Sequence, residues 1–142
     1  MNKLRFILIV PLLLLWACSS KQSDYEKIES FVLKNSEIKQ LANFNQVVVI
    51  SSGGECLNCN LKFSRIMAKR IDDPKNIFIV SDNGSNIDIS QYLDSKRKNI
   101  ILDPRNNFGK LKLTNGSTLI TIHNGKILKK IPINSTTLSR FK

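Results

Sequence analysis

The chain has 142 residues, with 22 Lys and Arg against 11 Asp and Glu, so its formal net charge is +11 at pH 7. This length is enough for one domain with a modest core. The basic residues are scattered rather than interleaved with aromatic ones, which argues against a nucleic-acid interface and favours a solvated basic surface near a membrane. The sequence contains no Gly-rich phosphate loop and no Ser/His/Asp arrangement.

The first 17 residues have the pattern of a secretory signal. Lys3 and Arg5 precede an apolar run of eleven residues, Phe6–Trp16. A helix needs about 20 such residues to span a bilayer, so this run is too short to be a membrane anchor. A basic segment followed by an apolar run of this length predicts a signal peptide over residues 1–17.

The end of the signal carries a more specific motif. "LWAC", residues 15–18, resembles the lipobox of bacterial lipoproteins, in which an aliphatic, a variable and a small residue precede a cysteine. The resemblance implies that Cys18 is acylated, for example with palmitate, and becomes the mature N-terminus. Residues 18–24 would then be the acylated cysteine and a polar tether. The domain would face the periplasm or the cell surface from a bacterial membrane.

Removal of the signal changes the composition in two ways. Loss of Lys3 and Arg5 lowers the 22 basic residues to 20 against 11 acidic ones, so the mature net charge is +9. Acylation of Cys18 would leave Cys56 and Cys59, which is one possible pair.

The remaining chain, 25–142, reads as one domain of alternating elements. Ser23 and Glu26 have the spacing of a capping box and predict a helix that starts there. Further helices are predicted at 57–71, weakly near 87–95, and from Ser135 onward. Strands are predicted at 46–51, 76–82, 99–103, 118–122 and 126–133. The last two form a hairpin around His123–Asn124–Gly125. Strands that alternate with helices and end in a hairpin predict an α/β sandwich with a mixed sheet.

The helix predicted at 57–71 places the two cysteines differently. One apolar face is made by Cys59, Phe63, Ile66, Met67 and Ile71. Asn60, Lys62, Arg65 and Lys69 should lie away from the centre of that face. Cys59 should therefore point inward, whereas Cys56, at the helix tip, should be the exposed sulfur. Residues three apart on a helix come close enough for a disulfide when the first turn relaxes.

This placement suits disulfide exchange. A helix N-terminus presents unpaired N–H groups and a partial positive charge, which stabilise a thiolate and lower its pKa. An exposed sulfur can then attack a partner's disulfide, and a sheltered second sulfur can resolve the mixed disulfide. Glu55, directly before Cys56, opposes this because a nearby carboxylate disfavours a thiolate.

The order strand, turn, C-x-x-C and helix resembles the redox motif of the thioredoxin fold. "LDPRNNFGKLKLTNGSTLITIHNGKIL", residues 102–128, resembles the second half of the TlpA-like thioredoxins, which are membrane-tethered thiol–disulfide oxidoreductases of the bacterial envelope. The similarity covers roughly residues 45–133.

The resemblance implies a thioredoxin-like α/β sandwich in which Cys56 attacks and Cys59 resolves. It implies no bound cofactor and no metal. The expected partners are envelope protein thiols or disulfides and a membrane redox protein. The residues expected in the groove that binds a partner are Glu55, Leu57, Asn58, Ser117 and Thr118.

Three positions depart from the family pattern. Glu55 stands where the family usually has Trp, and Ile50 where thioredoxin keeps a buried acid. Ser117 or Thr118 stands where the family has a cis-proline facing the disulfide.

Two alternatives to exchange therefore stay open. One is a binding domain with a purely structural disulfide, in which both sulfurs would be buried. The other is a copper carrier, in which His123 is the only histidine that could join the two thiolates.

Overall fold

The computed structural model describes residues 21–82, 84–93 and 96–141. The predicted signal peptide and the predicted acylation site, Cys18, lie outside these residues. Within them, no helix combines the length and the apolar character that crossing a membrane requires.

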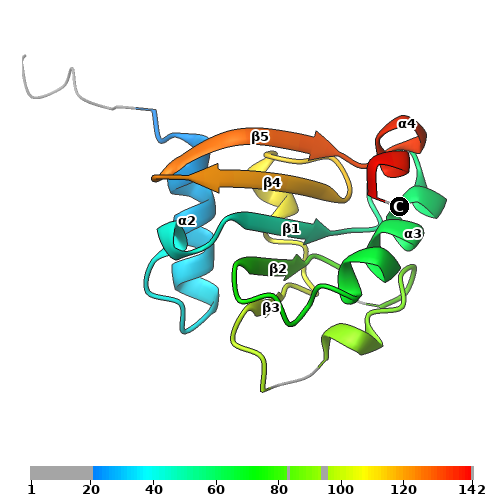
Figure 1. Ribbon diagram of the computed structural model, residues 1–142, viewed down its shortest axis with the longest axis horizontal. Helices are drawn as coiled ribbons and strands as arrows, with labels where there is room; N and C mark the ends of the chain where they lie inside the picture. The colour runs from blue at the N-terminus through cyan, green and yellow to red at the C-terminus, as the bar shows by residue number, and fades with distance from the viewer. Residues whose placement is uncertain (1–20, 83, 94–95, 142) are drawn as a thin grey trace, which may run out of the picture.

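A five-stranded mixed sheet forms the centre of the described chain (Figure 1). Its strands are β1 (Gln46–Ile50), β2 (Asn76–Val80), β3 (Ile100–Leu102), β4 (Thr118–His123) and β5 (Lys126–Pro132). Their order across the sheet is β3-β2-β1-β4-β5. β1, β2 and β3 are parallel, whereas β4 is antiparallel to both β1 and β5. The predicted α/β architecture with a mixed sheet is confirmed, and each strand ends within two residues of its predicted bounds.

Helices cover both faces of this sheet. α2 (Asp24–Asn35) packs on one face, and α3 (Leu57–Ala68) and α4 (Ser135–Leu138) pack on the other. Successive strand residues point to opposite faces. Val47 and Val49 therefore join the core under α2, while Val48 and Ile50 join the core under α3. The runs of consecutive apolar residues in β1 and β2 are explained by this burial on both sides.

The start of α2 follows the predicted capping box. The N–H of Glu26 donates to Ser23 Oγ at 3.2 Å, and the N–H of Ser23 donates to Glu26 Oε2 at 2.6 Å. These reciprocal bonds satisfy backbone donors that the first turn of a helix leaves free. Ile28, Phe31 and Val32 then form the buried side of the helix.

Two helix predictions need correction. α3 ends at Ala68 and continues as turns, although Ile71 is still buried as predicted. The helix predicted near 87–95 is only a 3-10 turn, Ser90–Tyr92, in the described part of that segment. The carboxylate of Asp88 accepts the N–H of Ser90 at 3.0 Å, a donor that the start of a helical turn leaves free.

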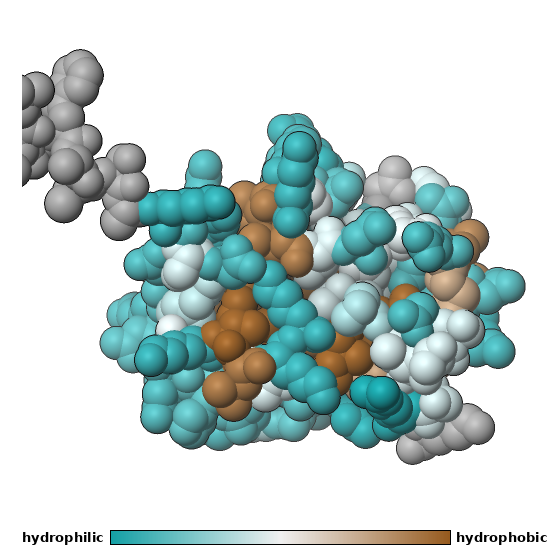
Figure 2. All heavy atoms as spheres, turned by 90° about the horizontal axis from the view of Figure 1, so that it is seen from above, coloured by the Kyte–Doolittle hydropathy of each residue, from teal (hydrophilic) through white to brown (hydrophobic). Residues whose placement is uncertain are grey.

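The hairpin of β4 and β5 turns where predicted. Asn124 and Gly125 have φ of +48° and +71°, as the two central residues of a type I′ turn require. β5 forms an edge of the sheet and carries Lys126, Lys129 and Lys130. Figure 2 shows the molecule from this side, where hydrophilic side chains separate the hydrophobic patches. Charged side chains on an edge strand discourage pairing with another chain.

Candidate active site at the Cys56–Cys59 disulfide

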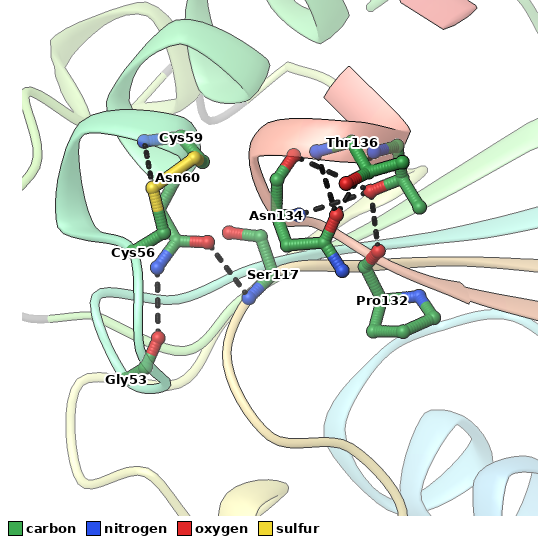
Figure 3. Close-up of a disulfide and its surroundings, with 9 residues drawn as sticks. Gly53, Cys56, Cys59, Asn60, Ser117, Pro132, Asn134 and Thr136 are labelled. Atoms are coloured by element: carbon green, nitrogen blue, oxygen red, sulfur yellow. Dashed lines mark hydrogen bonds between the residues drawn. A yellow bond between two sulfur atoms is a disulfide. The ribbon is translucent and has the colours of Figure 1, made fainter. Parts of the chain in front are cut away.

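Cys56 and Cys59 form a disulfide at the carboxyl end of the central strand β1, with an S–S distance of 2.00 Å (Figure 3). Cys56 follows the loop 51–55 and is the N-cap of α3, and Cys59 lies in the first turn of that helix. Cys59 is 5% exposed and belongs to the core under α3. Cys56 is only half-buried. The predicted burial of Cys59 is confirmed, whereas Cys56, predicted to be exposed, is partly buried against the same core.

The first turn of α3 directs backbone donors at Cys56. The N–H of Cys59 lies 3.3 Å from Cys56 Sγ and 3.1 Å from the Cys56 carbonyl oxygen. The N–H of Asn60 also donates to this carbonyl, at 3.1 Å. A thiolate formed at Cys56 on reduction would meet both the Cys59 donor and the positive end of the helix dipole. The site therefore has the backbone geometry that would stabilise a thiolate at Cys56.

Asn60 is placed differently from its prediction. It was expected away from the centre of the buried helix face, but it is only 1% exposed. Its Nδ2 donates to the Gly53 carbonyl oxygen at 2.7 Å, and its Oδ1 accepts the N–H of Ser117 at 3.2 Å (Figure 3). A buried amide is tolerated when its polar atoms are paired. Apolar periodicity could not reveal this residue, because it assigns polar positions to the surface.

The predicted groove residues fall into two groups. Glu55, Leu57 and Asn58 are exposed beside Cys56, where a partner could contact them. Ser117 and Thr118 are buried, with 0% and 2% exposure. In this conformation neither of the latter presents a side chain to a partner, and their role in a groove stays a prediction. No cis peptide bond occurs among the described residues, so the segment at Ser117 is trans.

The loop before Cys56 packs tightly on the segment before β4. Gly116 has φ of +83°, and a Cβ atom there would lie 2.3 Å from the Gly53 carbonyl oxygen. Only glycine allows both this conformation and this approach. Behind the loop lies a small cavity of 160 Å³, whose polar lining includes Ser51, Ser81 and Asn106.

A buried carboxylate organises the loop on the far side of that cavity. Asp103 Oδ2 accepts from the Ser81 hydroxyl at 3.0 Å and from the N–H of Phe108 at 2.7 Å. Asp103 Oδ1 accepts the N–H of Asn107 at 2.9 Å. Asp103, the acid of the "LDPRNNF" segment, therefore stabilises the structure, because these hydrogen bonds hold the loop 103–109 at the ends of β2 and β3.

His123 lies at the other end of the sheet. β4 runs antiparallel to β1, and Thr121 already pairs with Gln46, the first residue of β1. His123 is therefore beyond the start of β1, whereas Cys56 follows its end. In the part of the chain that is described, no three His, Cys, Asp or Glu residues are grouped as a metal site would need. This geometry argues against His123 as a third ligand beside the two sulfurs.

Comparison with known proteins returns no relative. No family model, no curated protein and no solved structure matches the chain. The basis for a functional assignment is therefore the disulfide itself, its unequal exposure and the hydrogen bonds around it.

Proposed function

We propose that this protein is a thiol–disulfide oxidoreductase of the bacterial cell envelope, held to a membrane by a lipid on Cys18. The observation that carries the proposal is the unequal exposure of the two cysteines of one disulfide, with Cys56 half-buried at the tip of α3 and Cys59 buried beneath it. A purely structural disulfide does not need a sulfur that a partner can reach. Thiol–disulfide exchange does need such a sulfur, because the partner disulfide must contact it.

The reaction has two balanced steps. In the reduced protein the Cys56 thiolate attacks one sulfur of a partner disulfide, whose S–S bond breaks, and the other partner sulfur leaves as a thiolate. Cys59 then loses its proton and attacks Cys56 Sγ, so that the mixed disulfide breaks and the first partner sulfur leaves. The cysteine pair is oxidised by two electrons, and the partner gains two electrons and two protons. The reverse sequence oxidises a partner dithiol.

The arrangement of the sheet supports a thioredoxin-like fold for this centre. The C-x-x-C helix follows the central strand, and a hairpin lies on one side of that strand and parallel strands on the other. The "LDPRNNFGKLKLTNGSTLITIHNGKIL" segment supplies the second half of that arrangement. The lipid anchor is supported by the "LWAC" motif and by the apolar run that precedes it.

The reduction potential of the Cys56–Cys59 pair tests the proposal. It can be measured on the domain from residue 21 onward by thiol trapping across glutathione buffers. A value between about −270 and −120 mV would match known exchange proteins and would show in which direction electrons flow. A value below about −300 mV would identify a structural disulfide and would leave a redox-silent binding domain as the function.

The anchor is tested separately in cells. A Cys18→Ser variant should lose incorporated fatty acid and should leave the membrane fraction, while the Cys56–Cys59 disulfide still forms. An unchanged membrane fraction and unchanged acylation would show that the "LWAC" motif is not used.

A further inference from the structure

One buried side chain joins three parts of the candidate site. Asn60 follows Cys59 directly in α3, and its amide bonds to Gly53 in the loop before Cys56 and to Ser117 before β4. These partners lie seven positions before it and 57 positions after it in the chain. Figure 3 shows the amide between the Gly53 carbonyl and the backbone nitrogen of Ser117.

The orientation of this amide is determined by its partners. A backbone carbonyl only accepts hydrogen bonds, and a backbone N–H only donates one. The Asn60 Nδ2 must therefore face Gly53 and its Oδ1 must face Ser117, since the flipped amide would satisfy neither. At 1% exposure the side chain has little access to water as a substitute. Loss of the amide would leave two backbone groups without these partners.

We propose that Asn60 is a positioning residue for thiol–disulfide exchange, an inference that rests on the function proposed above. Its amide holds the loop 51–55 and the segment at Ser117 against the first turn of α3. The loop leads directly into Cys56, so this clamp keeps Cys56 Sγ at 3.3 Å from the N–H of Cys59. Asn60 acts through Gly53 and Ser117, and it thereby maintains the donor that favours the attacking thiolate.

Asn60→Ala in the reduced protein tests this role, with Ser64→Ala as a matched control. Ser64 lies one turn further along α3, is equally buried, and its hydroxyl bonds to Tyr92 away from the disulfide. The readout is the pH profile of Cys56 alkylation by iodoacetamide, with the modified cysteine identified by mass. In Asn60→Ala the midpoint of thiolate formation should rise by about one pH unit. At a pH below both midpoints alkylation should be about threefold slower, because the tenfold smaller thiolate fraction is partly offset by higher nucleophilicity.

The Ser64→Ala control distinguishes an effect on the Cys56 thiol from a general loss of stability. Ser64→Ala should unfold at lower urea concentration, as Asn60→Ala should, yet it should keep the wild-type alkylation profile. A wild-type profile in Asn60→Ala would overturn the inference. If Asn60→Ala does not fold, Asn60→Asp replaces it, because it has the same shape but loses the donor to Gly53 when ionised. A wild-type profile in that variant at neutral pH would also overturn the inference.

Measurements on the wild-type protein alone test the proposed exchange function, independently of the Asn60 variants. A wild-type Cys56 that ionises like an ordinary cysteine and exchanges with no disulfide would reject both ideas. A reactive wild-type Cys56 that does not respond to Asn60→Ala would reject the positioning role and leave the exchange function standing.

Discussion

The hydroxyl of Ser117 bonds to both backbone groups of Ser51. It accepts the Ser51 N–H at 3.0 Å and donates to the Ser51 carbonyl oxygen at 3.0 Å. The last β1–β4 backbone pair, Val49 with Thr118, lies immediately beside this contact. The Ser117 side chain therefore continues the hydrogen bonding between β1 and β4 beyond their last backbone pair, toward the disulfide. The remaining groups of Ser117 are also used, since its N–H donates to Asn60 and its carbonyl accepts the N–H of Ile133.

Ser117→Pro should destabilise the protein. Proline would remove the N–H that Asn60 accepts and the hydroxyl that Ser51 uses. Unpaired buried polar groups cost about 1–3 kcal/mol each, so the free energy of unfolding should fall by about 3 kcal/mol or more. Urea unfolding measures this loss.

Ser117→Ala is the control for this substitution, because it keeps the N–H and loses only the hydroxyl. It should cost about 1–2 kcal/mol. A Ser117→Pro protein as stable as the wild type would show that the contact with Asn60 contributes nothing.

Gly116→Ala should be far more damaging than Gly125→Ala. Both glycines have positive φ, +83° and +71°, so the backbone strain of the substitution is similar. A Cβ at Gly125 meets nothing within 4 Å, whereas a Cβ at Gly116 lies 2.3 Å from the Gly53 carbonyl oxygen. Strain alone costs about 1 kcal/mol, and Gly116→Ala must also displace the loop before Cys56.

The comparison needs two measurements on each glycine variant. Urea unfolding should show a larger loss for Gly116→Ala, and the alkylation rate of reduced Cys56 should change in that variant only. Equal losses and equal alkylation rates would mean that the approach of the two loops has no consequence for the site.

Cys59→Ser should trap a mixed disulfide between Cys56 and a disulfide peptide. The remaining sulfur can attack, but no second sulfur is present to release the partner. Non-reducing gels and intact mass would detect the adduct, which should disappear on addition of dithiothreitol. Cys56→Ser is the control and should form little adduct, because Cys59 is only 5% exposed. The reverse result would exchange the roles of the two cysteines.

Tyr92 should make stability depend on alkaline pH. Burial raises the pKa of Tyr92 to about 12, although its bond to Ser64 lowers it. The unfolded chain releases this proton near pH 10, so the contribution is complete below pH 10 and is lost between about pH 10 and 12. From pH 9 to pH 11 the loss from this group should be about 1 kcal/mol.

The measurement compares urea unfolding of the wild type and Tyr92→Phe at these two pH values. At pH 9 the variant should be less stable by about 1 kcal/mol, since the hydroxyl donates to the Ser64 carbonyl oxygen at 2.7 Å. That difference should shrink or vanish at pH 11. An unchanged difference would show that Tyr92 ionises as readily in the folded protein as in the unfolded chain.

The sequence by itself determined the features that depend on near neighbours. The β-branched run at 46–51 predicts β1 because such side chains suit a strand buried on both faces. The capping box at Ser23 and the Asn-Gly turn at 124–125 are satisfied within three residues of themselves. Cys59 is buried because it begins the apolar face of the predicted helix, whereas Cys56 precedes that face at the helix tip.

Only the tertiary structure decided what Asn60 and Ser117 do. Their partners lie up to 66 positions away, and no local pattern specifies which distant backbone group meets a side chain. Asn60 is buried because the end of β1 and the start of β4 converge there and offer one acceptor and one donor. Short-range sequence patterns determine the helices and strands. The hydrogen bonds around the disulfide are determined by the way the end of β1 and the start of β4 meet.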